Sequence, residues 1–304
     1  MKAVVLIAYG GVDQLELRDV PEPDAGPNEI KVRMSGASIN PVDWKLRSGA
    51  LTSIVPLQFP AILGRDASGV VVAVGVGVTA FQIGSRVMGL VTRAYAEFVV
   101  ASTDAWADVP ATMDLVDAGA LPLVLLTGSQ LVEEAVQPHT GDVILVTGAA
   151  GSVGRTAVFV AKARGAEVWA GVRHGQRAAA RLLGAEGVVV LDDEAEISKL
   201  SQLDSIADTV GGETIKSLLG KVRRGGTIGS VVGEPTGAKE RGVIVHGLWA
   251  HPDAKRLEEL AGAVAQGRLT IPIAMRLPLS EARKAQELAE KGAGGKVVLT
   301  GRPF

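Results

Sequence analysis

Three glycines follow a buried apolar run at a spacing suited to binding a phosphate. Gly148, Gly151 and Gly154 come after the segment Val143-Ile-Leu-Val-Thr147, and a helix-forming segment follows them. A strand that turns through glycines into a helix presents unpaired backbone N–H groups, and phosphates bind at such helix N-termini. Gly148 permits the tight turn, Gly151 a close approach of a pyrophosphate, and Gly154 close packing of the helix on the strand. The spacing predicts a dinucleotide site; the alternative is an ordinary strand-turn-helix.

The turn after the next predicted strand contains arginines and no acidic residue. It is Val172-Arg-His-Gly-Gln-Arg177. An NAD site usually has Asp or Glu roughly 20 residues beyond the glycines, where it accepts hydrogen bonds from the ribose hydroxyls. Arg173 and Arg177 instead offer guanidinium groups that suit a 2′-phosphate. We therefore expect NADPH as the cofactor; the alternative is that both arginines are surface residues.

Alternating strands and helices position these residues in the middle of the chain. The alternation indicates an α/β domain with a doubly wound parallel sheet of the Rossmann type. The expected strands are 143–147, 167–171, 187–191, 204–208, 226–232 and 243–249, and the expected helices are 114–136, 151–164, 175–183, 211–221 and 253–266.

Both ends of the chain have β character. Strands are expected at 2–7, 29–38, 67–74 and 86–90, then at 269–277 and 295–299 after the nucleotide domain, with one helix near 280–291. Proline and glycine separate the early strands, which is typical of a β-rich, barrel-like domain. We expect this domain to comprise residues 1–115 and 268–304. The nucleotide-binding domain would comprise residues 116–267, with the active site in a cleft between the two.

Composition excludes several classes of function. The 304 residues are 47% hydrophobic, enough for sizeable cores, and the net charge of −2 offers no basic surface for nucleic acid. There is no cysteine, and the four histidines lack metal-binding spacing, so no metal site is expected. The apolar part of residues 1–8 is too short for a signal peptide, and apolar runs such as 70–78 fall short of the ~18 residues of a membrane span. We expect a cytoplasmic protein without membrane contact.

A series of short segments occurs in an order that is typical of one family. The segments are Asn40-Pro-Val-Asp43, Gly64-Arg-Asp-Ala-Ser-Gly69, Phe81-Gln-Ile-Gly-Ser-Arg-Val87, Ala94-Tyr-Ala-Glu-Phe98, Ala149-Ala-Gly-Ser-Val-Gly154, Asp208-Thr-Val-Gly-Gly212 and Gly295-Lys-Val-Val-Leu299. In this order the chain resembles, nearly end to end, the zinc-independent quinone oxidoreductases related to zeta-crystallin, which are medium-chain dehydrogenases/reductases. Zinc-dependent members have a cysteine where Asn40 stands and Gly-His-Glu where Gly64-Arg-Asp66 stands, and neither is present.

The resemblance implies a GroES-like β-rich catalytic domain beside the Rossmann domain. It also implies hydride transfer from NADPH to a quinone or to the β-carbon of an α,β-unsaturated carbonyl. Alternatives are an enoyl thioester reductase of the same superfamily and a weakly catalytic NADPH-binding or redox-sensing protein. A homodimer is expected, because relatives often pair a strand that matches the apolar segment 242–249, which has the character of an edge strand.

The resemblance also implies the catalytic residues. Asn40 would lie beside the nicotinamide. Lys45 stands where the family commonly has a tyrosine that faces the cleft, and in this departure it would donate to a developing enolate oxygen or orient substrate charge. Asn40 as a turn residue before Pro41, and Lys45 as a surface lysine, are the alternatives. Asp43 suits capping of a helix start as well as it suits catalysis. No proton donor is assigned.

Further cofactor contacts follow from matching positions. Thr127 would contact the cofactor, and the backbone amides of the glycine loop would bind the pyrophosphate. These loop residues are Ala150, Gly151, Ser152 and Val153. Val231, Val232 and Gly233 would line the carboxamide edge of the nicotinamide. Lys296 would reach the cofactor or the substrate, and a surface lysine is the alternative for it.

Overall fold

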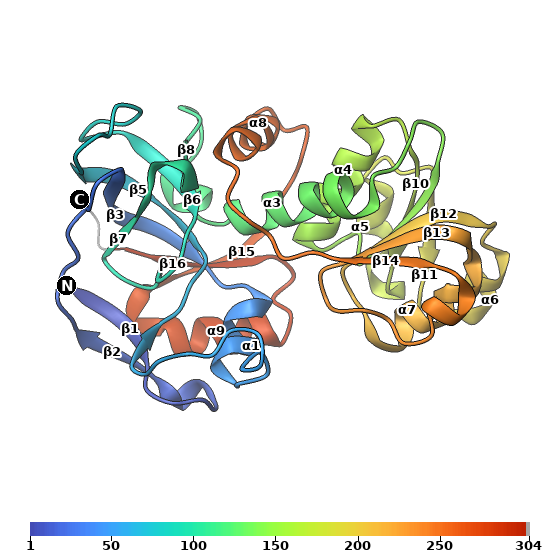
Figure 1. Cartoon of the computed structure of the whole chain (residues 1–304), viewed down its shortest axis with the longest axis horizontal. Helices are drawn as coiled ribbons and strands as arrows, with labels where there is room; N and C mark the ends of the chain where they lie inside the picture. The colour runs from blue at the N-terminus through green and yellow to red at the C-terminus, as the bar shows by residue number, and fades with distance from the viewer. Residues whose placement is uncertain (302–304) are drawn as a thin grey trace. The chain divides into compact units, whose positions relative to one another are not determined.

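A computed structural model describes residues 1–301 of the chain (Figure 1). The residues form two compact units. The first unit is Met1–Leu123 together with the chain from Pro252 onward, and the second is Val124–His251. The boundaries differ from the expected ones, since residues 116–123 and 252–267 belong to the first unit. Helix α2 (Leu115–Ala118) packs on three strands of that unit, and helix α8 (Ala254–Ala265) packs on a fourth.

The second unit contains a six-stranded sheet in which all neighbouring strands are parallel. The strand order is β11-β10-β9-β12-β13-β14, that is Gly187–Val190, Glu167–Val172, Val143–Thr147, Leu203–Asp208, Val222–Ser230 and Ile244–Gly247. The chain runs outward from β9 in one direction and then from β12 in the other. This reversal confirms the doubly wound sheet, and nucleotides bind at the carboxyl ends of strands beside such a reversal.

Helices of the second unit cover this sheet. They are η3 (Leu131–Val136), α4 (Ser152–Ala163), α5 (Arg177–Arg181), α6 (Glu194–Lys199) and α7 (Gly212–Leu218). Helix α4 packs on β9 and β10, and η3 packs on β12 and β13. The apolar face of α4 is buried while Lys162 and Ala163 at its end are exposed, as amphipathic spacing requires.

The expectation of one continuous helix over 114–136 is wrong. The structure has α2, then α3 (Pro122–Gln130), then the π-helical η3. Proline at the first position of α3 starts a new helix, because proline has no N–H to continue the preceding one. Leu115–Val136 as a whole is also long and apolar enough for a membrane span, whereas we expected every apolar run to fall short of one. In the structure, 78% of its most apolar window lies buried inside the protein, as in a core helix.

The first unit contains two sheets. The larger has the order β15-β16-β3-β5-β6-β8, with β7 paired to β3, and the smaller has the order β2-β1-β4. The bounds are β15 Ile273–Pro278, β16 Lys296–Thr300, β3 Glu29–Ser38, β5 Asp66–Val74, β6 Arg86–Leu90, β8 Trp106–Asp108, β7 Phe98–Ser102, β2 Leu15–Asp19, β1 Lys2–Leu6 and β4 Ala61–Ile62. The last strand of the chain, β16, therefore pairs with an early strand, β3.

Two further helices complete the first unit. Helix α1 (Pro41–Arg47) follows β3 directly, and α9 (Ala282–Glu290) precedes β16 and packs on both β16 and α1. Leu6, Ile30, Tyr95 and Trp106 are among the fully buried side chains of the core beneath them. The end of β3, the start of α1 and the start of β16 thereby meet in one packed region.

Candidate active site

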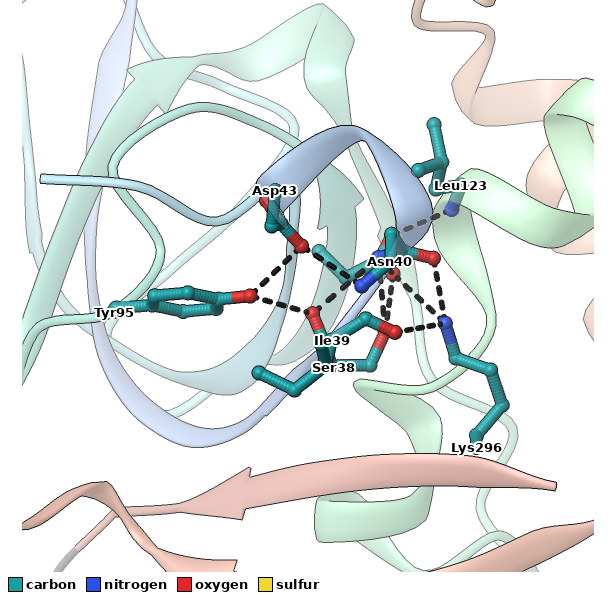
Figure 2. Close-up of polar contacts among 8 residues, drawn as sticks. Ser38, Ile39, Asn40, Asp43, Tyr95, Leu123 and Lys296 are labelled. Atoms are coloured by element: carbon teal, nitrogen blue, oxygen red, sulfur yellow. Dashed lines mark hydrogen bonds and ion pairs between the residues drawn. The ribbon is translucent and has the colours of Figure 1, made fainter. Parts of the chain in front are cut away.

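A buried polar network lies where β3 ends and α1 begins (Figure 2). We call it the Asn40 network. None of its side chains is more than 6% exposed. Its members come from four separate stretches of the first unit and are Ser38, Asn40, Asp43, Asp66, Tyr95 and Lys296.

Asn40 lies at the centre of the network. Its Nδ2 donates to Asp66 Oδ2 at 2.7 Å and to the backbone oxygen of Ser38 at 3.3 Å, and its Oδ1 accepts from Lys296 Nζ at 2.6 Å. Every polar atom of this amide is thus paired within the protein, which a simple turn residue would not require. Its expected contact with a nicotinamide stays a prediction.

Lys296 is buried, so its interpretation as a surface lysine is wrong. Its ammonium donates to Asn40 Oδ1 and, at 3.1 Å, to the backbone oxygen of Ile39, and lies 3.8 Å from Asp66 Oδ2. Burial lowers the pKa of Lys296, and the negative charges of Asp66 and Asp43 act in the opposite direction. The burial comes from the pairing of β16 with β3, which no local sequence signal reveals.

Asp43 caps the start of α1, as one of the two interpretations of the sequence predicts. Its Oδ2 accepts from the backbone N–H of Asn40 at 2.8 Å and from the hydroxyl of Tyr95 at 2.7 Å. Burial raises the pKa of Asp43 from 3.8 to about 6, although both hydrogen bonds oppose the rise. Burial and then the neighbouring Asp43 raise the pKa of Tyr95 well above its usual value, so this hydroxyl remains a donor.

Asp66 is a site residue that the sequence reasoning missed. Its Oδ2 accepts from Asn40 and from the hydroxyl of Ser38, and its Oδ1 accepts from the backbone N–H of Leu123 at 2.6 Å. It therefore caps the N-terminus of α3 as well as holding the amide of Asn40. A carboxylate at the start of the largely apolar strand Asp66–Val74 was the available signal.

Lys45, the other predicted catalytic residue, does not join the Asn40 network. It lies half-buried on α1, and its ammonium makes no hydrogen bond or ion pair with any residue of the stretch 1–301. Its role toward an enolate oxygen stays a prediction.

The glycine loop of the second unit has the conformation that its spacing predicts. Gly148 has φ +63°, and a Cβ on Gly154 would meet the Cα of Ala149 at 2.7 Å and overlap the carbonyl oxygen of Gly148. Gly151 is the N-cap of α4 without any side-chain cap. Among the described residues, the N–H groups of Ser152 and Val153 donate to no backbone oxygen outside the helix. Unpaired amides at the start of a 12-residue helix fit the phosphates of a dinucleotide.

The predicted residues after β13 lie at the same edge of the sheet as this loop. The carboxylate of Asp208 accepts from Thr147 Oγ1 at 2.8 Å and from Ser230 Oγ at 3.1 Å, and so joins the carboxyl ends of β9, β12 and β13. Val231 follows directly, and its N–H donates to the backbone oxygen of Asp208 at 3.1 Å. Gly233 has φ +110°, a conformation that favours glycine.

The two arginines predicted to bind a 2′-phosphate differ in the structure. Arg173 is exposed, and its guanidinium has no partner among residues 1–301. Arg177 donates to Glu196 of α6, whose other oxygen accepts from the N–H of Val190 at 2.9 Å. The guanidinium of Arg173 is thus open to an anion from solution, whereas that of Arg177 is already paired with a carboxylate. Thr127 lies in α3 and is 9% exposed.

The described residues contain no group of three or more His, Cys, Asp or Glu side chains placed to hold a metal ion. The polar groups that could contact a cofactor or substrate are the amide, carboxylate, phenol and ammonium groups of the Asn40 network and the backbone amides of the glycine loop.

Comparison with known proteins identifies similar chains over the full length. Residues 26–111 match the family model of the alcohol dehydrogenase GroES-like domain, and residues 183–299 match that of zinc-binding dehydrogenase. A chloroplast envelope quinone oxidoreductase homolog of Arabidopsis thaliana is 30% identical, with 98% of each chain covered. The quinone oxidoreductase of Coxiella burnetii has a similar structure, with a TM-score of 0.89, 30% identity and 99% of each chain covered. A mycobacterial protein solved in complex with NADPH has a TM-score of 0.84, 26% identity, and coverage of 99% of this chain and 100% of its own.

Proposed function

Because the chain belongs to the zinc-independent quinone oxidoreductase family of medium-chain dehydrogenases/reductases, we propose that it is an NADPH-dependent reductase of quinones or α,β-unsaturated carbonyls. The observation that supports this most strongly is the open N-terminus of α4 behind the glycine loop, with the exposed Arg173 one strand further along.

The residues of the second unit would hold the cofactor. The amides of Ser152 and Val153 would donate to the pyrophosphate, as an uncapped helix start favours a negative group. Arg173 would pair with the 2′-phosphate, and Val231 to Gly233 would lie along the nicotinamide. When bound, the nicotinamide supplies a hydride.

The first unit would position the acceptor. The Asn40 network is rigid, because its members are buried and joined by hydrogen bonds. A fixed polar network of this kind can orient a carbonyl acceptor without forming a covalent bond to it. We place the acceptor next to Asn40, and we assign its final proton to solvent.

An assay of NADPH oxidation tests the proposal. The purified protein would be supplied with quinones, 2-alkenals and 2-enoyl thioesters, and the loss of absorbance of NADPH would be followed. We expect turnover with quinones or alkenals to exceed turnover with thioesters. Turnover with thioesters alone would favour the enoyl reductase alternative, and NADPH binding without turnover of any acceptor would favour the binding-protein alternative.

The variant Arg173→Gln tests the choice of cofactor. A charge-assisted hydrogen bond to phosphate contributes about 1.5–3 kcal/mol, so the Kd of NADPH should rise about 10-fold or more while that of NADH changes little. Both constants can be measured by nucleotide fluorescence. Arg224→Gln removes the same charge from an exposed position on β13 and serves as the control. An unchanged ratio of the two Kd values in Arg173→Gln would remove this arginine from the site.

A homodimer is part of the proposal. Strand β14 is the last strand of its sheet, and Ile244 and Trp249 in and beside it are 49% and 48% exposed. An exposed apolar edge strand favours pairing with a second copy. Light scattering of the purified protein measures the mass directly, and the mass of a monomer would refute this part.

A further inference from the structure

Arg65 is the residue whose surroundings the proposed function leaves unexplained. It is half-buried, and its Nε is buried without a hydrogen-bond partner. None of the ion pairs and side-chain hydrogen bonds in the described chain uses its guanidinium. Buried donors in folded proteins are nearly always paired, so an orphaned one calls for an acceptor from outside the chain.

Two other arginines of the first unit, one buried and one half-buried, use their guanidinium groups within the fold. Arg47 donates to Gly10, Gln286 and Glu290 through all three of its nitrogens. Arg86 donates to two backbone oxygens near α2 through both terminal nitrogens. The described chain thus supplies acceptors to both of these guanidinium groups and none to that of Arg65.

The backbone on either side of Arg65 is fixed. Gly64 has φ +99°, and a Cβ there would meet the ring of Tyr95 at 2.6 Å. The backbone oxygen of Arg65 accepts from the N–H of Val91 at 2.9 Å. The next residue, Asp66, is anchored to Asn40 at 2.7 Å. The guanidinium thus extends from a rigid position one residue away from the Asn40 network.

The guanidinium of Arg65 is not neutralised by the carboxylates of the Asn40 network. Both oxygens of Asp66 accept from other donors, and no ion pair joins Arg65 to Asp43. A guanidinium carries a positive charge and presents several N–H donors in one plane. Such a group binds an oxygen that carries or gains negative charge.

We propose that Arg65 binds the carbonyl oxygen of the acceptor and stabilises the negative charge that develops there. This inference rests on the proposed function. Bound NADPH would supply the hydride, that is two electrons and one proton, and would leave as NADP⁺. In an enone the hydride bonds to the β-carbon, the π pair of the C=C bond moves toward the carbonyl, and the oxygen becomes an enolate oxygen. In a quinone the corresponding oxygen becomes that of a hydroquinone anion. Water then supplies the proton, and the charge on Arg65 does not change.

Kinetics of three variants test the role. In Arg65→Gln, kcat/KM for the acceptor should fall by about 100-fold or more, as when one oxyanion donor is removed elsewhere, while the KM for NADPH stays within about twofold. Arg65→Lys keeps the charge without the planar group, so its kcat/KM for the acceptor should lie between those of the wild type and Arg65→Gln. Added methylguanidinium should restore part of the activity of Arg65→Ala. Arg224→Gln is the charge-matched control, and its kinetics should equal those of the wild type.

A binding measurement separates failure of this inference from failure of the proposed function. Titration calorimetry with 4-nitrophenolate, at a pH where it is ionised, needs neither cofactor nor turnover. We expect the wild type to bind it at least about tenfold more tightly than Arg65→Gln, with equal thermal stability of the two proteins. If the wild type binds the phenolate through Arg65 but reduces no acceptor, only the proposed function fails. Equal binding by the two proteins, or wild-type kcat/KM in an active Arg65→Gln enzyme, would overturn the inference.

Discussion

The raised pKa of Asp43 predicts that the stability of the first unit decreases as the pH rises. Asp43 is fully buried, and one of its oxygens, Oδ1, has no partner among the described residues. The protonated carboxyl is favoured in the folded state, because its pKa there is about 6 against 3.8 for an ordinary aspartate. The stabilisation is therefore complete below about pH 3.8 and is lost as the pH rises through about 6.

The size of the effect follows from the same two values. A shift from 3.8 to about 6 corresponds to about 3 kcal/mol of unfolding free energy, most of which falls between pH 4 and pH 8. Asp43→Asn removes the titration while keeping an oxygen for Tyr95 and for the N–H of Asn40. We therefore expect the wild type to lose about 2 kcal/mol relative to Asp43→Asn over this range.

Urea unfolding followed by tryptophan fluorescence measures this difference. Trp44 and Trp106 lie in the first unit, whereas Trp169 and Trp249 lie in the second. Replacing the last two by phenylalanine makes the signal report on the first unit alone. Asp24→Asn, at an exposed aspartate, is the matched control and should follow the wild type at every pH. If the unfolding free energies of the wild type and Asp43→Asn changed with pH in the same way, the link between the raised pKa of Asp43 and stability would be refuted.

Two further substitutions test the glycine loop and the buried ammonium. Gly154→Ala should raise the Kd of NADPH, measured by nucleotide fluorescence, by more than about tenfold, because the new methyl group overlaps the loop backbone. The control is Gly262→Ala in α8, where a Cβ meets open space, and it should bind NADPH as tightly as the wild type does. Lys296→Met should lower the unfolding free energy by about 3–5 kcal/mol in urea, because it leaves buried carboxylates without their cation. The exposed Lys255→Met is its control, and a loss no larger than in that control would show that the buried ammonium contributes nothing.

The sequence predicts the nucleotide-binding unit well, because its signals are local. The strand expected at 143–147 is β9 with the same bounds, and the helix expected at 151–164 is α4 shortened by one residue at each end. An apolar run, a glycine turn and a helix-forming stretch are all contained within about twenty residues. The break before Pro122 was missed because the apolar pattern continues across it while the proline starts a new helix.

The Asn40 network could not be predicted in the same way, because its members are distant in the sequence. Asn40 and Asp66 are 26 residues apart, and Asn40 and Lys296 are 256 residues apart. The segment Gly294-Gly-Lys296, which ends at the first residue of β16, has the composition of an exposed turn, and only the pairing of β16 with β3 buries the lysine. The resemblance to a family indicated Asn40 but not the partners that hold its amide.

The discontinuity of the first unit bears on how the chain folds while it is being made. Strand β16 lies between β15 and β3 in one sheet, and its first residue is Lys296. During synthesis residues 1–123 leave the ribosome without this strand and without the ammonium that neutralises Asp66. Residues 124–251 form a complete unit before β16 is translated. We therefore expect the nucleotide-binding unit to fold first, and the N-terminal segment to reach its native state only after β16 has left the ribosome.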